Sequence, residues 1–410
     1  MNRTVIFHVL IIAAALVNSG CTVSEVITAE TTDLDVASLN IEENLLLDVG
    51  VLNFDAGVPK KNNIEKSGIY PEIRQAESRY LPYHIKQTLQ GTGYWGAVRV
   101  VPDQFSFTDV TLSGKIIRSD GEFATLRIKA EDSLGNEWYE RSYTVQTGLN
   151  SYAEYRDHAE DPYQKMFNDI ANDLRAYAAT LEPQQITRMR QASELKFFAD
   201  MAPAAYGDYL STDKDGKTTV VRLPAENDPM VARLRQIRER DRLVVDTLNE
   251  HYANFYYGIA IPYEGWRKTS REQAIAYRQT RRSAAMRALL GVAVVAGSMS
   301  VDTGGSHSRT KQAVQYVGID RGLRTIYDAW RMRSSANIYR ENIKELSESF
   351  VAEAAPLVIE VDGETRSLTG TAEAQYESWR KLLHEIYQSE TGLADTVDLS
   401  VPERSTESGG

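Results

Sequence analysis

Hydrophobic and polar residues alternate over several short stretches in the first half of the chain. The alternation is clearest in the expected strand 122–131, where apolar and polar side chains take turns from Ala124 to Glu131. A period of two residues places the two sets on opposite faces of a strand, so one face is apolar and the other is solvated. The run at 45–54 is apolar almost throughout, which indicates a strand buried on both faces at the centre of a sheet. Further strands are expected at 95–101, 110–119 and 138–146.

Apolar residues spaced three and four apart predict helices before and after these strands. One helix is expected at 72–90, where Pro82 either kinks it or begins a second helix. Asp161 and Pro162 have the residue types of an N-cap and a first helical position, so another helix is expected to begin there. Its apolar stripe, which ends near Leu181, would cover the sheet.

The second half of the chain has mostly helical spacing. Asp228 and Pro229 repeat the cap signal and open a long helix, whose apolar positions imply packing against another long helix in the same chain or in a partner chain. Asp241 falls on that apolar seam and weakens it. Thr269 and, three residues later, Glu272 form a capping box that predicts the start of a further helix.

These elements predict an α+β fold, in which a small α/β sandwich domain with a mixed sheet is followed by a mostly α-helical domain. We place the α/β domain at 44–182 and the helical domain at 183–400, with a small hairpin near 357–368 around an Asp-Gly turn. A disordered tail is expected at 401–410. The chain has 410 residues, of which 42% are hydrophobic and 25% charged, and this suits two folded globular domains.

The N-terminal segment 1–20 has the order of a signal peptide. Arg3 precedes an apolar run at 5–17, and small and polar residues follow directly before Cys21. As a helix the run would span about 20 Å, which is less than the roughly 30 Å of a bilayer core, so we expect cleavage rather than a permanent span. Cys21 is the only cysteine of the chain, and a plain secreted protein with an incidental cysteine is the alternative.

The residues that end at Cys21 resemble the lipobox of bacterial lipoproteins, whose cysteine is lipidated after cleavage. The resemblance implies that residues 21–43 form a lipidated tether carrying palmitate or a similar acyl chain. Asn18 departs from the pattern, because these proteins usually have an aliphatic residue there. Thr22, in place of an aspartate after the cysteine, implies sorting to the outer membrane. The resemblance therefore places the protein at the periplasmic face of the outer membrane.

A second resemblance covers about 140 residues of the expected α/β domain. The runs VGVLNF, GYWGAVRVVP, VTLSGKIIRSDG and LRIKAEDSLGNEW look like the small α/β domain of several envelope proteins. These are the amino-terminal domain of the Tol translocation protein, the curli secretion lipoprotein and the lipoprotein activators of penicillin-binding proteins. The matching marks are a G-x-I strand at Gly114 and Ile116 and a D-x-x-G turn at Asp132 and Gly135. Those domains act by binding, so the resemblance implies a docking function without catalytic residues.

Charge is unevenly distributed along the chain. The net charge of −11 argues against a general nucleic-acid binder, but residues 267–340 contain fourteen Lys and Arg against four acids. This segregation favours an anionic partner, such as lipid head groups, lipopolysaccharide phosphates, peptidoglycan carboxylates or an acidic protein. The alternative is that the acidic remainder of the chain or of an oligomer neutralises the basic segment. The candidate patch consists of Arg267, Lys268, Arg271, Arg278, Arg281, Arg282 and Arg287.

An uncharged stretch at 288–301 follows this patch. A helix of this length reaches about 21 Å, which is too short to cross a bilayer comfortably. Gly291 and Gly297 would allow close approach of two helices in an oligomer, and a buried core helix is the alternative.

No local motif for catalysis, cofactor binding or metal binding occurs in the sequence. The histidines that remain after signal removal are widely scattered, and the cluster of aromatic residues at 252–266 suits either helix contacts or stacking on sugar rings. We therefore predict a non-enzymatic outer-membrane lipoprotein that binds or assembles envelope partners and uses no cofactor, metal or nucleic acid. The alternatives are a periplasmic peptidoglycan hydrolase that uses carboxylates and an oligomeric component of a secretion complex.

Overall fold

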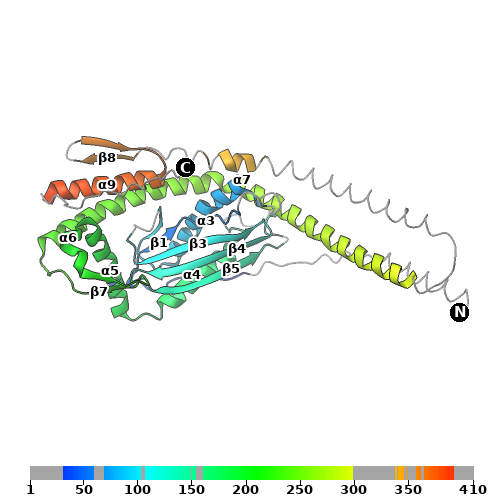
Figure 1. The fold of residues 1–410 in the computed structure, drawn as a ribbon, viewed down its shortest axis with the longest axis horizontal. Coiled ribbons are helices and arrows are strands. Elements are labelled where there is room, and N and C mark those ends of the chain that lie inside the picture. The colour runs from blue at the N-terminus through cyan, green and yellow to red at the C-terminus, as the bar shows by residue number, and fades with distance from the viewer. Residues whose placement is uncertain are drawn as a thin grey trace, which may run out of the picture.

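A computed structural model of the chain shows a body built on one sheet and a long helix that crosses the body and extends beyond it (Figure 1). The predicted signal peptide, Cys21 and the tail at 401–410 lie outside the described residues. The structure describes residues 31–59, 69–102, 107–148, 150–153, 160–298, 338, 340–345, 348, 357–361 and 364–391.

The centre of the body is a five-stranded sheet with the strand order β2-β1-β3-β4-β5. Strand β1 pairs in parallel with both β2 and β3, whereas β3, β4 and β5 form an antiparallel meander. The predicted α+β class with a mixed sheet is confirmed. The strand bounds are β1 Val49–Leu52, β2 Val98–Val101, β3 Val110–Ser119, β4 Phe123–Asp132 and β5 Glu137–Gln146.

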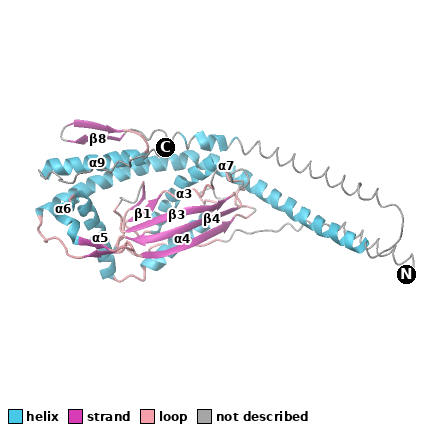
Figure 2. Cartoon of the chain, viewed as in Figure 1, coloured by secondary structure: helices cyan, strands magenta, loops and turns pink. Residues whose placement is uncertain are grey.

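Two helices, α3 (Pro71–Thr92) and α4 (Gln164–Ala178), cover one face of this sheet, as Figure 2 shows. Strand β4 alternates as predicted, because Leu126 and Ile128 are fully buried while Arg127 between them is exposed. The residues that α4 contributes to the shared core are Met166, Phe167, Ile170, Ala171 and Leu174.

The structure contradicts one of the two alternatives at Pro82 and the expected first residue of α4. Pro82 does not begin a second helix; it lies inside the continuous α3, where its buried neighbours Leu81 and Ile85 fix the helix to the core. Helix α4 begins at Gln164 rather than at Pro162. Residues 162 and 163 form a turn that precedes the helix, and Asp161 Oδ1 accepts the Tyr163 N–H at 2.8 Å, as expected of a capping residue.

The chain after α4 adds a smaller helical layer with two hairpins. The hairpin predicted around the Asp-Gly turn is present as β8 and β9, and Leu357 pairs with Leu368. The elements are η1 Glu43–Leu45, α5 Pro183–Met201, α6 Pro203–Tyr206, η3 Gly207–Tyr209, β6 Leu210–Thr212, β7 Thr218–Val220, β8 Leu357–Val361, β9 Glu364–Leu368 and α9 Ala372–Thr391.

Helix α7 (Pro229–Ser298) has 70 residues and is therefore about 105 Å long. It begins as predicted, since Asp228 Oδ1 accepts the Met230 N–H at 2.9 Å. The predicted helix start at Thr269 is wrong, because Thr269 Oγ1 donates to the Gly265 carbonyl at 3.0 Å inside the continuous helix.

The long helix joins both parts of the body. Leu234 and Leu248 of α7 share a core with Leu383 of α9, so its apolar seam packs against a helix of the same chain. Farther along, Tyr263 and Trp266 belong to the core beneath the sheet. Side chains on both sides of the expected boundary at residue 182 thus contribute to one core.

The expected tether is in contact with the body for part of its length. Asn168 Nδ2 donates to the Thr32 carbonyl at 2.7 Å, and Asn172 Oδ1 accepts the Asp35 N–H at 2.9 Å. Asp35 also pairs with Arg175 at 3.1 Å. From Thr32 onward the chain is therefore held against α4.

Candidate functional site

The structure places Arg267, the first residue of the candidate basic patch, inside the core. Its side chain is 2% exposed, and both terminal nitrogens donate to the Asp161 carboxylate at 2.9 Å. The guanidinium also lies over the rings of Tyr163 and Tyr263, with its carbon 4.9 and 4.4 Å from their centres. The prediction that Arg267 faces an anionic partner is wrong, because a carboxylate about a hundred residues earlier in the chain neutralises it.

Two further members of the patch contact the body. Arg271 Nε donates to Thr147 Oγ1 at 3.1 Å, and Arg278 pairs with the buried Glu122. Lys268 is exposed. These contacts attach α7 to the turn between β3 and β4 and to Thr147, which directly follows β5. Residues 279–298 form the outer part of α7.

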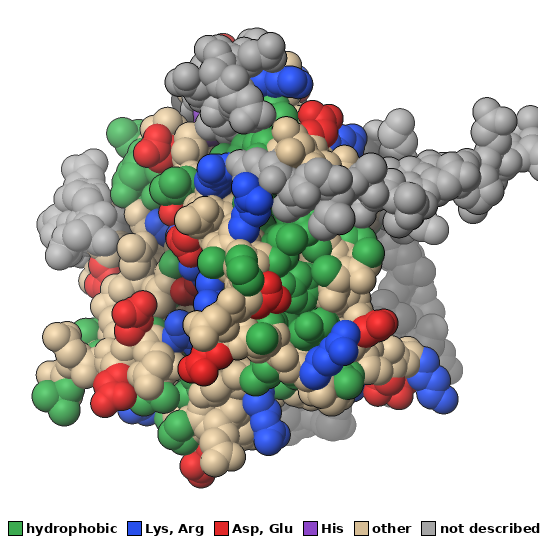
Figure 3. Space-filling view, turned by 90° about the vertical axis from the view of Figure 1, so that its left-hand side faces the viewer, with side chains coloured by type: hydrophobic (Ala, Val, Ile, Leu, Met, Phe, Trp, Pro, Cys, Tyr) green, Lys and Arg blue, Asp and Glu red, His purple; other side chains and the backbone are tan. Residues whose placement is uncertain are grey.

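The remaining candidates lie on the outer part of α7. The backbone of Arg281, Arg282, Arg287, Gly291 and Gly297 belongs to the helix, while the side chains of the three arginines lie outside the described residues. Their roles stay predictions. At the other end of the body, which carries α6 and α9, acidic and basic side chains are interspersed among apolar ones (Figure 3).

The aromatic cluster of α7 mostly fills helix contacts. Tyr252, Phe255, Tyr263 and Trp266 are buried, and only Tyr257 is strongly exposed, at 62%. The first interpretation of this cluster, helix packing, therefore accounts for most of it.

Histidine 84 is buried next to this cluster. Its Nδ1 lies 2.7 Å from Tyr256 Oη and its Nε2 lies 2.9 Å from Gln164 Oε1. Burial lowers the pKa of His84, against the opposing effect of Asp161. Within the described part of the chain, no group of three or more His, Cys, Asp or Glu side chains is placed to hold a metal ion.

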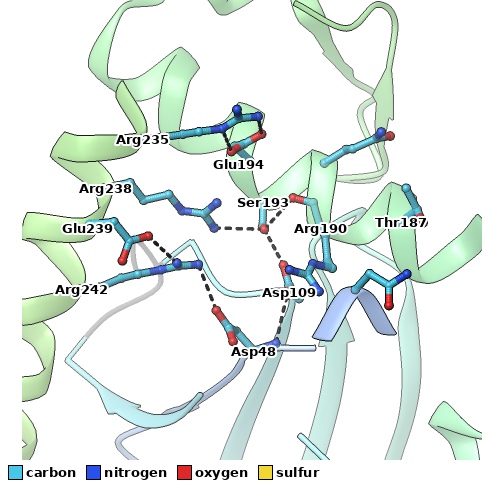
Figure 4. Close-up of a pocket in the computed structure, with 12 residues that line it drawn as sticks. Asp48, Asp109, Thr187, Arg190, Ser193, Glu194, Arg235, Arg238, Glu239 and Arg242 are labelled. Atoms are coloured by element: carbon cyan, nitrogen blue, oxygen red, sulfur yellow. Dashed lines mark hydrogen bonds and ion pairs between the residues drawn. The ribbon is translucent and has the colours of Figure 1, made fainter. Parts of the chain in front are cut away.

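A polar cavity of about 430 Å³ lies between α5, α7 and the sheet edge at which β1 and β3 begin (Figure 4). Both helices line it with residues spaced one helical turn apart, so each contributes one polar stripe. The lining consists of Asn44, Asp48, Asp109, Thr187, Arg190, Gln191, Ser193, Glu194, Arg235, Arg238, Glu239 and Arg242.

The floor of the cavity is formed by Asp48 and Asp109, which immediately precede β1 and β3. These strands are parallel and Val49 is paired with Val110, so the two aspartates lie side by side. Asp109 Oδ2 accepts the Asp48 N–H at 2.9 Å, and Asp48 Oδ1 accepts the Ala97 N–H at 2.9 Å. Both carboxylates are thereby fixed by backbone donors.

Ser193 of α5 and Arg238 of α7 meet above Asp109. Ser193 Oγ donates to Asp109 Oδ1 and accepts from Arg238 Nη2 at 3.2 Å. Burial raises the pKa of Asp109, although the Ser193 hydroxyl and the Asp48 N–H oppose this effect. Burial also lowers the pKa of Arg238, and the neighbouring Arg242 cation adds to this effect. The carboxylates of Asp109, Glu194 and Asp48 oppose this lowering, so charges of both signs lie close together here.

The other two arginines that α7 contributes are paired. Arg235 binds Glu194 of α5 through two nitrogens at 2.8 and 3.2 Å. Arg242 donates to Asp48 at 3.0 Å and to Glu239 at 2.7 Å. With fixed donors and acceptors around an open volume, the cavity is suited to hold a small polar ligand by charge and hydrogen bonds.

This cavity was not predicted from the sequence. Its two helical stripes recur at i, i+3, i+4 and i+7: Thr187, Arg190, Gln191 and Glu194 in α5, and Arg235, Arg238, Glu239 and Arg242 in α7. A polar stripe at this spacing usually indicates a solvated helix face. Two such stripes were the available signal, but the sequence does not show that they face each other.

Comparisons with models of known protein families, with curated protein sequences and with solved structures find no match to this chain. Among the helices in the described ranges, none combines the length and the apolar character that a membrane span requires.

Proposed function

We propose that this chain is a non-enzymatic, lipid-anchored factor at the periplasmic face of the outer membrane, which binds or assembles partners of the cell envelope. The observation that carries the proposal is the course of α7, which belongs to the body over its first part and extends beyond it over its last part (Figures 1 and 2). A helix of this kind can present a partner-binding surface at a distance from the folded body.

The outer part of α7 is well suited to such a surface. The Arg278–Glu122 ion pair joins the helix to the sheet, and α7 continues to Ser298 over a further 20 residues, or about 30 Å. This stretch contains Arg281, Arg282 and Arg287 followed by uncharged sequence. Basic residues ahead of an apolar end favour an anionic envelope component or a second copy of the chain.

The attachment of the tether to α4 supports an anchored position near the membrane. Thr32 and Asp35 are hydrogen-bonded to α4, so the ten residues 22–31 separate Cys21 from the body. Fully extended, they span at most about 35 Å. A lipid on Cys21 would therefore keep the α4 side of the body within about 35 Å of the bilayer surface.

Metabolic labelling tests the anchor. We expect labelled palmitate on the full-length chain and its recovery in the outer-membrane fraction. The Cys21→Ser variant should lose the label and leave that fraction. A full-length product without label, or one that stays in the cytosol, would contradict the proposed location.

Site-specific photo-cross-linking in the native cells tests the binding role. A photoreactive residue at Arg282, on the outer part of α7, should yield adducts with an envelope component or with a second copy of the chain. The matched control is Arg127, which is exposed on the open face of the sheet. Adducts of equal yield at both positions, or none at Arg282, would contradict the proposal. Release of muropeptides from peptidoglycan, abolished by one Asp or Glu substitution, would favour the hydrolase alternative instead.

A further inference from the structure

We propose that the cavity between α5, α7 and the β1–β3 edge binds a small ligand through one anionic group, a phosphate or a carboxylate, held by Arg190 and Arg238. The proposal depends on the cavity alone. It requires neither a lipid on Cys21 nor a partner on the outer part of α7.

Arg238 has unused hydrogen-bonding capacity on the cavity wall. Its described hydrogen bonds come from Nη2, which donates to the Phe107 carbonyl at 3.0 Å and to Ser193 Oγ at 3.2 Å. Within the described residues, its Nε and Nη1 have no hydrogen bond, and no carboxylate forms an ion pair with it. A guanidinium carries five N–H donors, so this side chain retains N–H groups on Nε and Nη1 that can each donate to an oxyanion.

Arg190 faces the same space from α5, as Figure 4 shows. Its described hydrogen bonds come from Nη1, which donates to the carbonyls of Glu43 and, at 3.1 Å, Leu46. These bonds to backbone oxygens fix the guanidinium but leave its positive charge without an acidic partner among the described residues. Two arginines that are held in place by neutral groups thus face one cavity from opposite helices.

The lining contains four arginines and four acidic residues, and the other two arginines are already paired with carboxylates. Arg235 is neutralised by Glu194, and Arg242 by Asp48 and Glu239. Burial and the Arg242 cation lower the pKa of Arg238, and the carboxylates of Asp109, Glu194 and Asp48 oppose this effect only in part, so a bound anion would stabilise the charged guanidinium further.

The size and the rest of the lining define the ligand further. A volume of about 430 Å³ lies within the range of about 300–1,000 Å³ that is usual for small-molecule pockets. Asn44, Thr187 and Gln191 add amide and hydroxyl groups to the wall. An anionic group on a polar body, as in a sugar phosphate or a sugar acid, therefore matches the cavity better than an apolar molecule.

Calorimetric titration of the chain from residue 21 onward, with Cys21→Ser to prevent lipidation, tests the site. The probes are inorganic phosphate, glucose 1-phosphate and glucuronate, which separate the phosphate source from the carboxylate source. We expect saturable binding of at least one probe at millimolar concentration or below, together with a rise in Tm. Arg238→Met should weaken that binding at least tenfold.

Arg188→Met is the matched control, because Arg188 lies on α5 but is exposed and does not line the cavity. It should change the affinity by less than about threefold, whereas Arg238→Met and Arg190→Gln should both weaken it strongly. If Arg238→Met fails to fold, Arg190→Gln keeps the test decisive. The proposal is overturned if the folded chain binds none of the probes, or if Arg188→Met weakens binding as much as Arg238→Met and Arg190→Gln do.

Discussion

Asn249 of α7 completes the hydrogen bonding of Val100 at the outer edge of β2. Its Oδ1 accepts the Val100 N–H at 2.9 Å, and its Nδ2 donates to the Val100 carbonyl at 3.0 Å. One turn earlier, Asp246 binds Arg99 through both carboxylate oxygens. A strand edge with free backbone groups is open to pairing with another chain, so the helix closes this edge of the sheet.

Replacing Asn249 with Leu should destabilise the protein markedly. Both backbone groups of Val100 would remain buried without a partner, at a cost of about 1–3 kcal/mol for each group. Unfolding in urea should therefore show a loss of about 2–6 kcal/mol. Glu250→Gln, one position along on the exposed face, is the control and should change stability by less than about 0.5 kcal/mol. Equal urea midpoints for Asn249→Leu and the wild type would disprove the stabilising role of the Asn249–Val100 hydrogen bonds.

The Asp161–Arg267 pair should make stability depend on acid pH. Burial alone would raise the pKa of Asp161, but the charge and hydrogen bonds of Arg267 outweigh it and lower this pKa to about 2. Because the folded pKa lies below the ordinary 3.8, the contribution of the ionised carboxylate is complete above about pH 4 and is lost as the pH falls towards 2. Asp161→Asn should cost about 3–5 kcal/mol at pH 7, and its difference from the wild type should shrink below pH 4.

An apolar replacement separates the charge effect from packing. In the double variant Asp161→Leu and Arg267→Met, no buried charge is left unpaired, so we expect it to recover most of the loss caused by Asp161→Asn. Its stability relative to the wild type should rise as the pH falls below 4, because it lacks the carboxylate. A double variant as unstable as the single one at pH 7 would mean that the geometry of the pair, rather than its charge balance, holds this part of the core.

Asp241 should act as an anchor for α9, although its sequence position suggests a defect in the helix seam. Its Oδ1 accepts the indole N–H of Trp379 at 3.1 Å and lies 3.5 Å from Arg380 Nη1. Asp241→Ala leaves the buried indole N–H without an acceptor, so it should lower the free energy of unfolding by about 2–3 kcal/mol. A loss below about 0.5 kcal/mol would show that the polar contact does not anchor α9.

The variant Asp241→Asn should behave differently from Asp241→Ala, and differently at two pH values. Burial raises the pKa of Asp241, with Arg380 opposing the effect. A folded pKa above the ordinary 3.8 means that the wild type loses stability as the pH rises through this window. An asparagine keeps an acceptor for Trp379 but does not titrate. Urea unfolding should therefore show Asp241→Asn gaining on the wild type between pH 4 and pH 7; an unchanged difference would contradict this.

The fold could be predicted from the sequence for strands and helices that bury only one face. In β4 the alternation of Leu126 and Arg127, and in α4 the spacing of Met166 and Ile170, follow directly from facing one core. Residues that usually mark the end or the start of a helix were less reliable. Pro82 resembles a break, yet its buried neighbours keep α3 continuous, because tertiary packing outweighs the loss of one backbone hydrogen bond.

The candidate site was harder to predict because its parts are distant in the sequence. Ser193 and Arg238 lie on different helices, and Asp109 precedes a strand, so only the folded chain brings them together. The same limit explains the error at Arg267. A cluster of basic residues indicates exposure, and nothing near Arg267 in the sequence reveals that Asp161 neutralises it.

Thr269 provides the sharpest test of the continuity of α7. If Thr269 were an N-cap, Thr269→Ala would cost about 1 kcal/mol. Because its hydroxyl donates to Gly265 inside the helix, and because Ala is the better helix former, we expect urea unfolding to show stability equal to the wild type or higher by about 0.5 kcal/mol. Thr269→Pro should instead cost about 3 kcal/mol or more and reduce helical circular dichroism, since it interrupts the helix just before Arg271 and Arg278. A loss of 1 kcal/mol or more in Thr269→Ala would point to two helices meeting at this residue.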